Sequence, residues 1–293
     1  MTPSASLKEL LGRPGMLIAP GAYDALGARQ IEQAGFEAVY MTGGGTSIAH
    51  GFPDFGLLNM GEMVDTAALM ARSIRVPLIA DADTGYGNEL NVIRTVREYE
   101  ARGVSAIHIE DQVSPKRCGH LDGKLVISRE EFVSKIRAAV EARRTKEFVI
   151  IARTDSRAMM DLDEAIWRAN AALNAGADMA FVEATQTREE VAAVPQRVHG
   201  PCLLNVVPGG RTPVFDLREA ETMGYKLAIL PGLMLKAAIE AGDAALAELK
   251  ATSIAPSVNR SVAETFRRFG ADEWDALRTR FNNAPSPAGR GQG

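Results

Sequence analysis

The chain has 293 residues, of which 46% are hydrophobic and 24% charged, and its formal net charge is -4. This is the composition of an ordinary soluble globular protein, and the small negative charge argues against nucleic acid as a partner. Two cysteines are too few for a disulfide framework, and the start "MTPSASLKELL" lacks the plan of a secretory signal. No apolar run approaches the roughly 18 to 20 residues needed to cross a bilayer. We therefore expect a cytoplasmic protein without a membrane partner.

Short apolar runs alternate with amphipathic helical patterns along most of the chain. This alternation predicts parallel strands joined by helical crossovers, and near-continuous apolar character is typical of strands covered on both faces. The predicted strands, in chain order, are residues 15–21, 38–44, 77–85, 106–112, 148–155, 179–185, 202–207 and 226–232.

The segments between these runs have helical periodicity. The stretches "NELNVIRTVREYEARG" and "DLDEAIWRANAALNAG" place apolar residues three and four positions apart and end in glycine, a common helix C-terminal signal. Eight strand–helix units favour an α/β fold of the closed (β/α)8 TIM barrel type. An open doubly wound sheet is the alternative, although no G-x-G-x-x-G motif opens a helix, which disfavours its dinucleotide-binding form.

The C-terminal residues exceed what a barrel needs. We assign residues 1–250 to the catalytic barrel and residues 251–282 to a helical extension, in which 257–281 read as one or two helices with an apolar side. These helices could cap the barrel or pack on a second subunit. The tail 283–293 is rich in proline and glycine and has almost nothing to bury, so we expect it to be disordered.

Polar side chains recur at the C-terminal ends of the predicted strands, which meet at one mouth in a barrel. Asp81 and Asp83 are two positions apart, so on a strand their side chains would share a face, and Glu110 could join them around a divalent cation. Alternatively, these acids cap the helices that follow. The full set is Thr42, Asp81, Asp83, Glu110, Asp111, Arg153, Asp155, Glu183 and Asn205.

Two further features of the strand ends point to anion binding. In "TGGGTS", after the second strand, three glycines let backbone N–H groups turn inward, where they could bind a carboxylate or phosphoryl group. Such turns are also common without a ligand. Arg153 ends an apolar strand and needs an anionic neighbour, either a ligand or a structural partner such as Asp155 or Glu183. Asn205 could be a satisfied core amide or a substrate contact.

The loop "SPKRCGHLDGK", residues 114–124, concentrates a thiol, an imidazole and basic side chains. Cys118 lies beside Lys116, Arg117 and His120, a setting expected to lower the pKa of the thiol and make it reactive. A chance cysteine in a basic loop is the alternative. Cys202 starts an apolar strand and is expected to be buried. The other histidines lack metal-ligand spacing, and no chemistry is assigned to them: His50, His108 and His199.

With these residues in view, the chain resembles the isocitrate lyase and phosphoenolpyruvate mutase superfamily over roughly residues 5 to 280. The motifs "KRCGH" (116–120) and "DADTGYG" (81–87) carry the resemblance, supported by "GAYDALGARQIEQAGFEAVYMTGGG". "KRCGH" is typical of the lyase branch, because phosphonate-forming mutases typically have Asn in place of Cys118. The resemblance implies a (β/α)8 barrel that acts on small 2-oxo or 2-hydroxy acids with Mg2+, for which Mn2+ could substitute.

Carried over by position, the resemblance implies that Asp83 binds Mg2+ directly while Asp81 and Glu110 hold it through water. The residues implied to form the substrate pocket are Tyr40, Thr42, Gly43, Gly44, Asp54, Arg153, Glu183 and Asn205. The mobile gating loop would contain Lys116, Cys118, Gly119 and His120. The superfamily is usually tetrameric and exchanges a C-terminal helix, so we expect a homotetramer with a small carboxylate as its substrate.

Departures from the superfamily bear on the substrate. Methylisocitrate lyases carry hydroxyl residues soon after the seventh and eighth strands to hold a third carboxylate, whereas this chain reads "NVVPGG" and "ILPGLML" there. "GGRTP" at 209–213 is similar to the branch of dimethylmalate lyase, petal death protein and carboxyphosphonoenolpyruvate mutase. A dicarboxylate with alkyl substituents is then easier to accommodate, because an unpaired buried carboxylate is costly.

Our hypothesis is a Mg2+-dependent retro-aldol lyase for a substituted malate-like acid, such as dimethylmalate or 2-methylisocitrate, that releases pyruvate or a related 2-oxo acid. Cys118 would protonate the departing carbanion, with His120 and Lys116 tuning it. Arg153 belongs to the same catalytic set, and Tyr40 is one candidate base. The alternatives are an oxaloacetate decarboxylase, a carboxyphosphonoenolpyruvate phosphonomutase and a non-catalytic barrel that binds a dicarboxylate.

Overall fold

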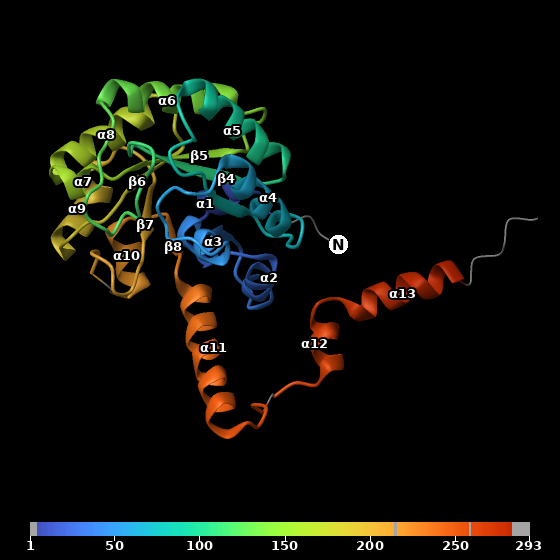
Figure 1. Cartoon of the computed structure of the whole chain (residues 1–293). Coiled ribbons are helices and arrows are strands. Elements are labelled where there is room, and N and C mark those ends of the chain that lie inside the picture. Colours follow the sequence, from blue (N-terminus) through green and yellow to red (C-terminus); the bar gives the residue numbers. More distant parts are fainter. Residues whose placement is uncertain (1–4, 214–215, 258, 283–293) are drawn as a thin grey trace, which may run out of the picture. The chain divides into compact units, whose positions relative to one another are not determined.

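Eight parallel strands close into a barrel in the computed structural model, which describes residues 5–213, 216–257 and 259–282 (Figure 1). The strands follow one another in chain order, and β8 pairs with β1, with Leu17 opposite Leu227. This pairing leaves no free edge, so the predicted (β/α)8 barrel is confirmed and the open sheet is wrong. The strands are β1 (Leu17–Ala22), β2 (Val39–Met41), β3 (Leu78–Asp81), β4 (Ala106–Glu110), β5 (Val149–Thr154), β6 (Met179–Val182), β7 (Cys202–Asn205) and β8 (Leu227–Leu230).

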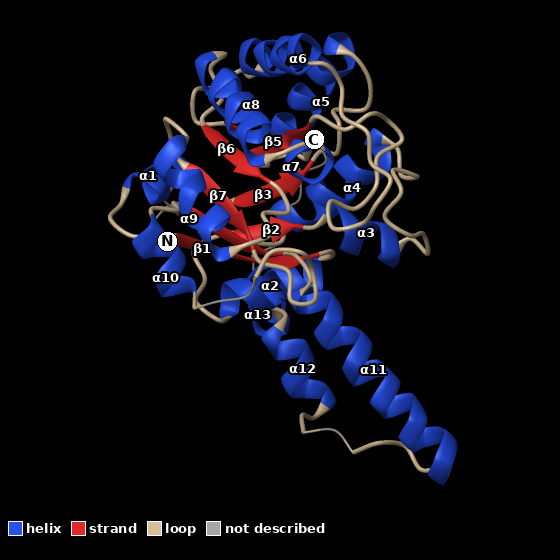
Figure 2. Cartoon of the chain, turned by 90° about the vertical axis from the view of Figure 1, so that its left-hand side faces the viewer, coloured by secondary structure: helices blue, strands red, loops and turns tan. Residues whose placement is uncertain are grey.

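Helices surround the strands, as Figure 2 shows. Most begin at a side chain that accepts a hydrogen bond from a first-turn N–H, for example Asp24, which accepts from the N–H of Gly27 at 2.7 Å. Two short helices, α3 (Gly43–Ala49) and α7 (Ser156–Met159), directly follow β2 and β5. The other helices around the strands are α2 (Ala25–Gln33), α4 (Met60–Ala71), α5 (Glu89–Ala101), α6 (Arg129–Ala142), α8 (Leu162–Asn174), α9 (Arg188–Arg197) and α10 (Leu217–Met223).

The two helical stretches named from the sequence are α5 and α8. Each ends shortly before a glycine with a left-handed backbone, Gly103 (φ +83°) and Gly176 (φ +104°). Glycine reaches this conformation without steric penalty, which is why it stops helices so often. These two predictions are therefore confirmed.

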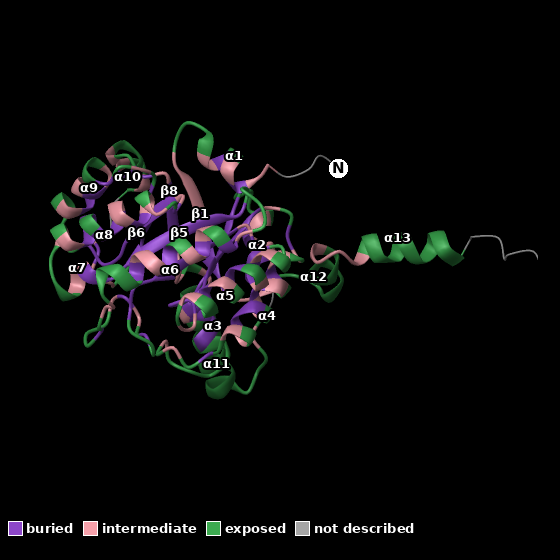
Figure 3. Ribbon diagram, turned by 90° about the horizontal axis from the view of Figure 1, so that it is seen from above, coloured by how far each residue is buried: buried purple, intermediate pink, exposed green. Residues whose placement is uncertain are grey.

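Apolar side chains fill the inside of the barrel and the layer between strands and helices. Tyr40, Ile151 and Phe181 belong to the inner cluster, and Leu7 of α1 (Leu7–Gly12) packs against this cluster. The strands are buried over most of their length (Figure 3). Burying a side chain such as Phe181 stabilises the fold by about 1.5–3 kcal/mol. The barrel is a packed core, so chemistry is confined to its ends.

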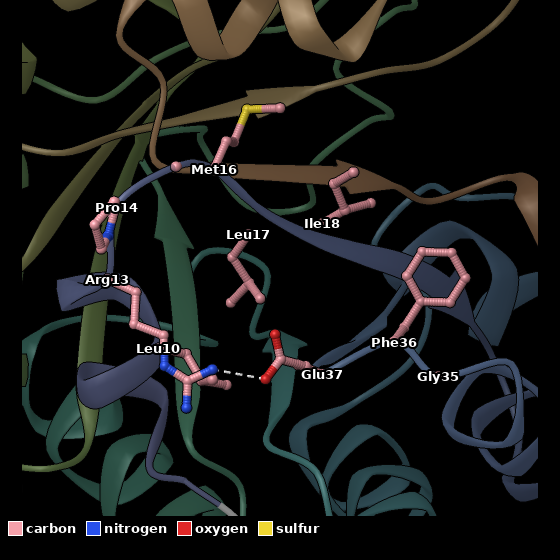
Figure 4. Close-up of a pocket in the computed structure, with 10 residues that line it drawn as sticks. Leu10, Arg13, Pro14, Met16, Leu17, Ile18, Gly35, Phe36 and Glu37 are labelled. Atoms are coloured by element: carbon pink, nitrogen blue, oxygen red, sulfur yellow. Dashed lines mark hydrogen bonds and ion pairs between the residues drawn. The ribbon is translucent and has the colours of Figure 1, made fainter.

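A cavity of about 240 Å³ lies at the N-terminal end of the barrel, beside the start of β1 (Figure 4). Arg13 Nη1 lies 2.7 Å from Glu37 Oε1 at its rim, and Leu10 and Leu17 line it. This end of a TIM barrel contributes to stability, whereas catalysis uses the opposite end.

Three further helices follow β8: α11 (Leu233–Thr252), α12 (Val262–Arg268) and α13 (Ala271–Asn282). The last two confirm the helices expected within 257–281. One compact unit ends at Ile239 and the next begins at Glu240, within α11. The domain boundaries at 250 and 282 stay predictions, and the tail 283–293 lies outside the described residues. None of the described helices has the length and apolar character needed to span a membrane.

Candidate active site

Side chains from successive strands meet at the C-terminal end of the barrel. They are buried and come from β3, β4, β5, the residue just after β6, and β7: Asp81, Glu110, Arg153, Glu183 and Asn205. Arg153 Nη1 lies 3.1 Å from Glu110 Oε2, and its Nη2 lies 3.4 Å from Glu183 Oε2. Asn205 Nδ2 donates to the same Glu183 oxygen at 2.9 Å. The structure thus brings these predicted site residues together.

Asp83 reaches this cluster through a turn. β3 ends at Asp81, and Asp83 has a left-handed backbone with φ +46°. The N–H of Asp83 donates to Asp81 Oδ1 at 2.9 Å. The expectation that both side chains share a strand face is therefore wrong, because the alternation ends before Asp83. The helix-capping alternative is also wrong for this pair, since Asn88 caps α5.

The surroundings of Asp81 and Asp83 shift the pKa values of these two side chains in opposite directions. Burial opposes ionisation of Asp81, but the charges of His108, Lys116 and Arg153 lower the pKa of Asp81 to about 2. Burial raises the pKa of Asp83 to about 6, even though Lys116 acts in the opposite direction. Acids held this close repel one another unless cations lie among them.

An unsatisfied carboxylate oxygen tests whether a divalent cation suits the cluster. Glu110 Oε1 is buried without a hydrogen-bond partner, whereas Asp83 Oδ1 lies 2.9 Å from Lys116 Nζ and Glu110 Oε2 lies 3.1 Å from Arg153 Nη1. Burial also raises the pKa of Glu110 well above its usual range. Hard cations such as Mg2+ prefer such oxygen ligands. The residues therefore fit a divalent cation, and their role as ligands stays a prediction.

The three carboxylates do not form a closed cage. Among the described residues, no group of three or more His, Cys, Asp or Glu side chains is arranged to hold a metal ion. Mg2+ commonly keeps waters and substrate oxygens as ligands beside one or two carboxylates. An incomplete protein ligand set is compatible with that way of binding.

The loop 114–124, here called the lid, covers the cluster. Lys116 is only 4% exposed, and its ammonium group pairs with Asp54 and lies 2.9 Å from Asp83 Oδ1. The N–H of Cys118 donates to the carbonyl of Asp54 at 3.1 Å. Burial opposes the charge of Lys116, but Asp83 and Asp54 raise the pKa of Lys116 well above its usual value. Asp54 therefore anchors the lid at two points.

The pKa of the Cys118 thiol differs from the sequence expectation. Burial is the main influence on this half-buried thiol, and it raises the pKa of Cys118 above its usual value. The expected lowering is wrong because the basic neighbours are engaged elsewhere: Lys116 pairs with two aspartates, and the Arg117 guanidinium lies 5.2 Å from the centre of the Phe55 ring. A thiol that stays protonated suits a proton donor better than a nucleophile.

Gly119 and His120 complete the contact of the lid with the strand ends. A Cβ on Gly119 would lie 2.5 Å from Arg153 Nη2 and 2.6 Å from Glu183 Cγ, so only glycine fits there. His120 Nε2 lies 3.3 Å from Glu183 Oε1. Both residues therefore join Arg153 and Glu183, as the sequence predicted.

The glycine run 43–45 begins a helix, so the turn expected there is wrong. Thr42 precedes α3, and its hydroxyl oxygen accepts from the N–H of Gly45 at 3.3 Å. A Cβ on Gly43 would lie 2.4 Å from Asp81 Oδ2, and one on Gly44 would lie 3.3 Å from Asp54 Oδ2. First-turn N–H groups have no acceptor within their helix, so they remain available as donors beside the carboxylates.

Known proteins resemble this chain in sequence. A family model described as phosphoenolpyruvate phosphomutase matches residues 7–250. The chain belongs to this family. It is 48% identical over 242 residues to the 2,3-dimethylmalate lyase of Eubacterium barkeri, covering 82% of this chain and 84% of that protein. It is 42% identical over 247 residues to the 2-methylisocitrate lyase of Aeropyrum pernix, covering 84% and 80% respectively.

A solved structure agrees with these relatives. The trigonal crystal form of a 2,3-dimethylmalate lyase, a member of the phosphoenolpyruvate mutase and isocitrate lyase superfamily, superposes with a TM-score of 0.90 at 40% identity. The match covers 97% of both chains. The sequence resemblance to this superfamily is therefore confirmed, and superfamily members generally depend on a divalent metal ion.

In this phosphoenolpyruvate phosphomutase family member, Tyr40 lies inside the barrel below the carboxylates. Its hydroxyl group is 2.8 Å from His108 Nε2, and both side chains are buried. Burial raises the pKa of Tyr40 well above its usual value, which suits a phenol that stays protonated rather than a base. Burial also lowers the pKa of His108 to about 4, so this imidazole is neutral at pH 7.

Two residues near the site lacked a sequence assignment. His108 lies two positions before Glu110 on β4, and this spacing is the signal that could have placed it on the inner face. Lys124 is buried, its ammonium group donates to the carbonyl of Gly119, and Nζ lies 3.5 Å from Asp155 Oδ1. No local pattern marks Lys124 as buried.

Arg153 has a structural partner as well as the site contacts. Its Nε donates to Asp155 Oδ2 at 2.9 Å and its Nη2 to Oδ1 at 3.2 Å. The two interpretations of Arg153 from the sequence are therefore compatible, because Asp155 orients the guanidinium while the other edge meets Glu110 and Glu183.

Proposed function

We propose that this family member is a divalent-cation-dependent carbon–carbon lyase. Its substrate would be a substituted malate-like 2-hydroxy acid such as 2,3-dimethylmalate, and one product would be pyruvate or a related 2-oxo acid. The observation that carries this proposal is that the lid, which contains the thiol of Cys118, closes over Asp81, Asp83 and Glu110. The 48% identity to a 2,3-dimethylmalate lyase supports the same reaction class.

Asp83, Asp81 and Glu110 would hold the cation, Mg2+ or Mn2+. When bound, the cation acts as a Lewis acid on the oxygen of the carbonyl that forms. The protein itself supplies a buried oxygen without a hydrogen-bond donor, Glu110 Oε1, beside the carboxylate of Asp83. Lys116 balances part of their negative charge, which keeps Asp83 ionised at neutral pH.

The substrate's carboxylates would meet the remaining polar groups. The N–H groups of Gly43 and Gly44 at the start of α3 suit one carboxylate, together with the hydroxyl group of Thr42. Arg153 would attract another by its positive charge, since its N–H groups already face Asp155, Glu110 and Glu183. Glu183 and Asn205 would orient this end of the site, because they hydrogen-bond each other beside Arg153.

Cys118 would deliver the proton. Cleavage of the C2–C3 bond, with loss of the 2-hydroxyl proton to a basic group of the site, leaves an enediolate on the departing acid, and the carbon of this enediolate takes a proton from the thiol. A raised thiol pKa keeps that proton in place until the carbanion forms. The closed lid would exclude water, which otherwise competes as a proton source.

The apolar ends of β7 and β8 bear on the substrate. Val206 and Leu230 pack in the outer hydrophobic cluster, against residues such as Val191. These two side chains therefore face the surrounding helices, and the residues that follow them, Val207 and Pro231, also lack a hydroxyl group that could receive a third carboxylate. An unpaired carboxylate there would be unfavourable, so we favour alkyl-substituted dicarboxylates over tricarboxylates.

A substrate panel with Mg2+ tests the proposal. The panel contains 2,3-dimethylmalate, other substituted malates, 2-methylisocitrate, isocitrate and oxaloacetate, and the 2-oxo acid released is measured. We expect cleavage of a substituted malate that stops with EDTA and returns with Mg2+. Turnover of oxaloacetate alone would contradict the proposal, as would a new carbon–phosphorus bond detected by phosphorus NMR. Unchanged turnover in EDTA would remove the metal requirement.

We also propose a homotetramer in the cytoplasm. No residue of α11, α12 or α13 is buried, and exposed apolar side chains on and beside these helices suit an interface. They include Leu246, Ile254, Val262, Phe266, Trp274 and Phe281. Both cysteines are free thiols, which suits a reducing compartment. Light scattering after gel filtration should give about four times the chain mass of 31.4 kDa. A single chain mass would contradict the tetramer.

A further inference from the structure

The loop that follows β7 contacts the lid through one residue, Arg211. Its backbone N–H donates to His120 Nδ1 at 3.0 Å, and its Nε donates to the His120 carbonyl at 3.2 Å. A terminal nitrogen of the same guanidinium pairs with Asp122. Arg211 and His120 are 91 positions apart in the sequence. Three contacts therefore join two loops at the mouth of the barrel.

The backbone beside Arg211 permits this close approach. A Cβ on Gly210 would lie 2.7 Å from His120 Nδ1 and 3.0 Å from its Cε1. Real Cβ atoms do not come this close to a ring, so glycine allows the β7–α10 loop to lie directly on the imidazole. The contact is thus built from the main chain as well as from the arginine side chain.

The hydrogen bond to Nδ1 also assigns the tautomer of His120. Since Nδ1 accepts a hydrogen bond from the Arg211 N–H, a neutral imidazole carries its own proton on Nε2. Nε2 lies 3.3 Å from Glu183 Oε1, on the side of the site. The β7–α10 loop therefore sets which nitrogen of His120 faces Glu183.

We propose that Arg211 is a positioning residue that clasps the lid in its closed position and orients His120 toward Glu183. The other lid contacts, from Lys116 to Asp54 and from Lys124 to Asp155, hold the loop at other points. The proposal rests on the proposed function only in that the lid covers a catalytic site. The contacts themselves involve no substrate.

The ion pair is the weaker part of the clasp. The Asp122 side chain is 94% exposed, and pairs with such partners contribute little. The two hydrogen bonds to His120 are partly buried and depend on its fixed place. Removing the guanidinium breaks the hydrogen bond from Nε as well as the ion pair, while the backbone N–H still donates to Nδ1, so this removal should release the lid more than removing the Asp122 carboxylate.

Alkylation of Cys118 by iodoacetamide measures lid opening without substrate. Cys118 is half-buried in the lid, whereas Cys202 is 1% exposed, so peptide mass spectrometry follows Cys118 selectively. We expect Arg211→Ala to react about tenfold faster than the parent protein, from the loss of hydrogen bonds. We expect about a twofold increase for Asp122→Ala. An unchanged rate in Arg211→Ala would overturn the proposal.

Matched variants separate a clasp from a general loss of structure. Arg218→Ala removes a 91% exposed arginine from the following helix and should leave the rate unchanged. The double variant Asp122→Ala and Arg211→Ala should react like Arg211→Ala alone, since Asp122 acts through Arg211. Arg211→Lys should lie between parent and alanine variant. Equal acceleration in Arg218→Ala, or additive effects in the double variant, would also contradict the clasp.

The rate of substrate cleavage is the second measurement that tests the clasp. Arg211→Ala should lower kcat/KM for the acid cleaved fastest by about tenfold, with partial rescue in Arg211→Lys. If the parent protein cleaves no 2-hydroxy acid, the proposed function fails while the alkylation rates still decide the clasp. If Arg211→Ala loses its circular dichroism signal, the alkylation rates of Cys118 in Arg211→Lys and in Asp122→Ala test the proposal instead. Rates equal to that of the parent protein in both variants would overturn it.

Discussion

The ammonium nitrogen of Lys116 lies 2.9 Å from Oδ1 of Asp83. The same nitrogen pairs with Asp54, so one lid residue joins the end of β3 to the loop between α3 and α4. Closing the lid therefore delivers a positive charge to the carboxylates. Opening it removes that charge and exposes the site, which couples the electrostatics of the site to the position of the lid.

Replacement of Lys116 tests this coupling. Lys116→Met keeps an unbranched side chain one atom shorter but leaves Asp54 and Asp83 without their cation. We expect kcat/KM to fall by about 100-fold, as when a charged group is removed from an active site. The control Lys146→Met changes an exposed lysine and should behave like the parent protein. Steady-state kinetics measure kcat/KM of both variants. A value for Lys116→Met equal to that of the parent protein would contradict the role of Lys116.

Replacement of Cys118 tests the proton donor. A serine hydroxyl is a far weaker acid than a thiol, so Cys118→Ser should lower kcat by about 100-fold. Cys202 is buried at the start of β7, at the end of the strand opposite the site, and Cys202→Ala should keep activity close to that of the parent. If Cys118→Ser cleaves a malate-like acid at nearly the parental rate, another group supplies the proton.

Gly119→Ala tests the closed position of the lid. The added methyl group would lie 2.5 Å from Arg153 Nη2, so the lid cannot close without moving Arg153 or Glu183. Overpacking of about 1.4 kcal/mol would lower kcat/KM about tenfold, with little change in Tm because the strain ends when the lid opens. Gly12→Ala meets nothing within 4 Å and serves as the control. Equal kcat/KM values in the two variants would contradict a closed lid during turnover.

Glu164 on α8 makes a pH-dependent contribution to stability. Hydrogen bonds from Arg129, opposed by partial burial and aided by Arg168, lower the pKa of Glu164 to about 2. Because the folded protein holds this carboxylate ionised, its contribution is present above the ordinary glutamate pKa and disappears as the pH falls toward 2. Glu164→Gln should lower the free energy of unfolding at pH 7 by about 1 kcal/mol.

Chemical denaturation at several pH values measures this effect. The difference between parent and Glu164→Gln should shrink steadily below the ordinary glutamate pKa. The control Glu141→Gln changes an exposed acid on α6 and should alter stability little at any pH. A difference between parent and Glu164→Gln that is constant with pH would show that the ion pairs with Arg129 and Arg168 contribute nothing.

The order of strands and helices could be predicted from the sequence because its signals are local. Apolar runs such as residues 106–112 and helical stretches such as 89–101 need only neighbours in the chain to be recognised. The positions of Asp81, Glu110 and Arg153 at strand ends followed from the same pattern, since a closed barrel brings all strand ends to one mouth. The lyase-type lid motif 116–120 is likewise a local feature.

Contacts between segments that are distant in the sequence decided the charge states and the lid contacts. Lys116 meets Asp54 across 62 positions and Arg211 meets His120 across 91, and no periodicity links such residues. The raised pKa of the Cys118 thiol has the same origin, because burial and the pairing of Lys116 outweigh the charges next to it in the chain. Secondary structure and the list of polar strand ends thus depend on near neighbours, whereas charge states and lid contacts depend on which surfaces the closed barrel brings together.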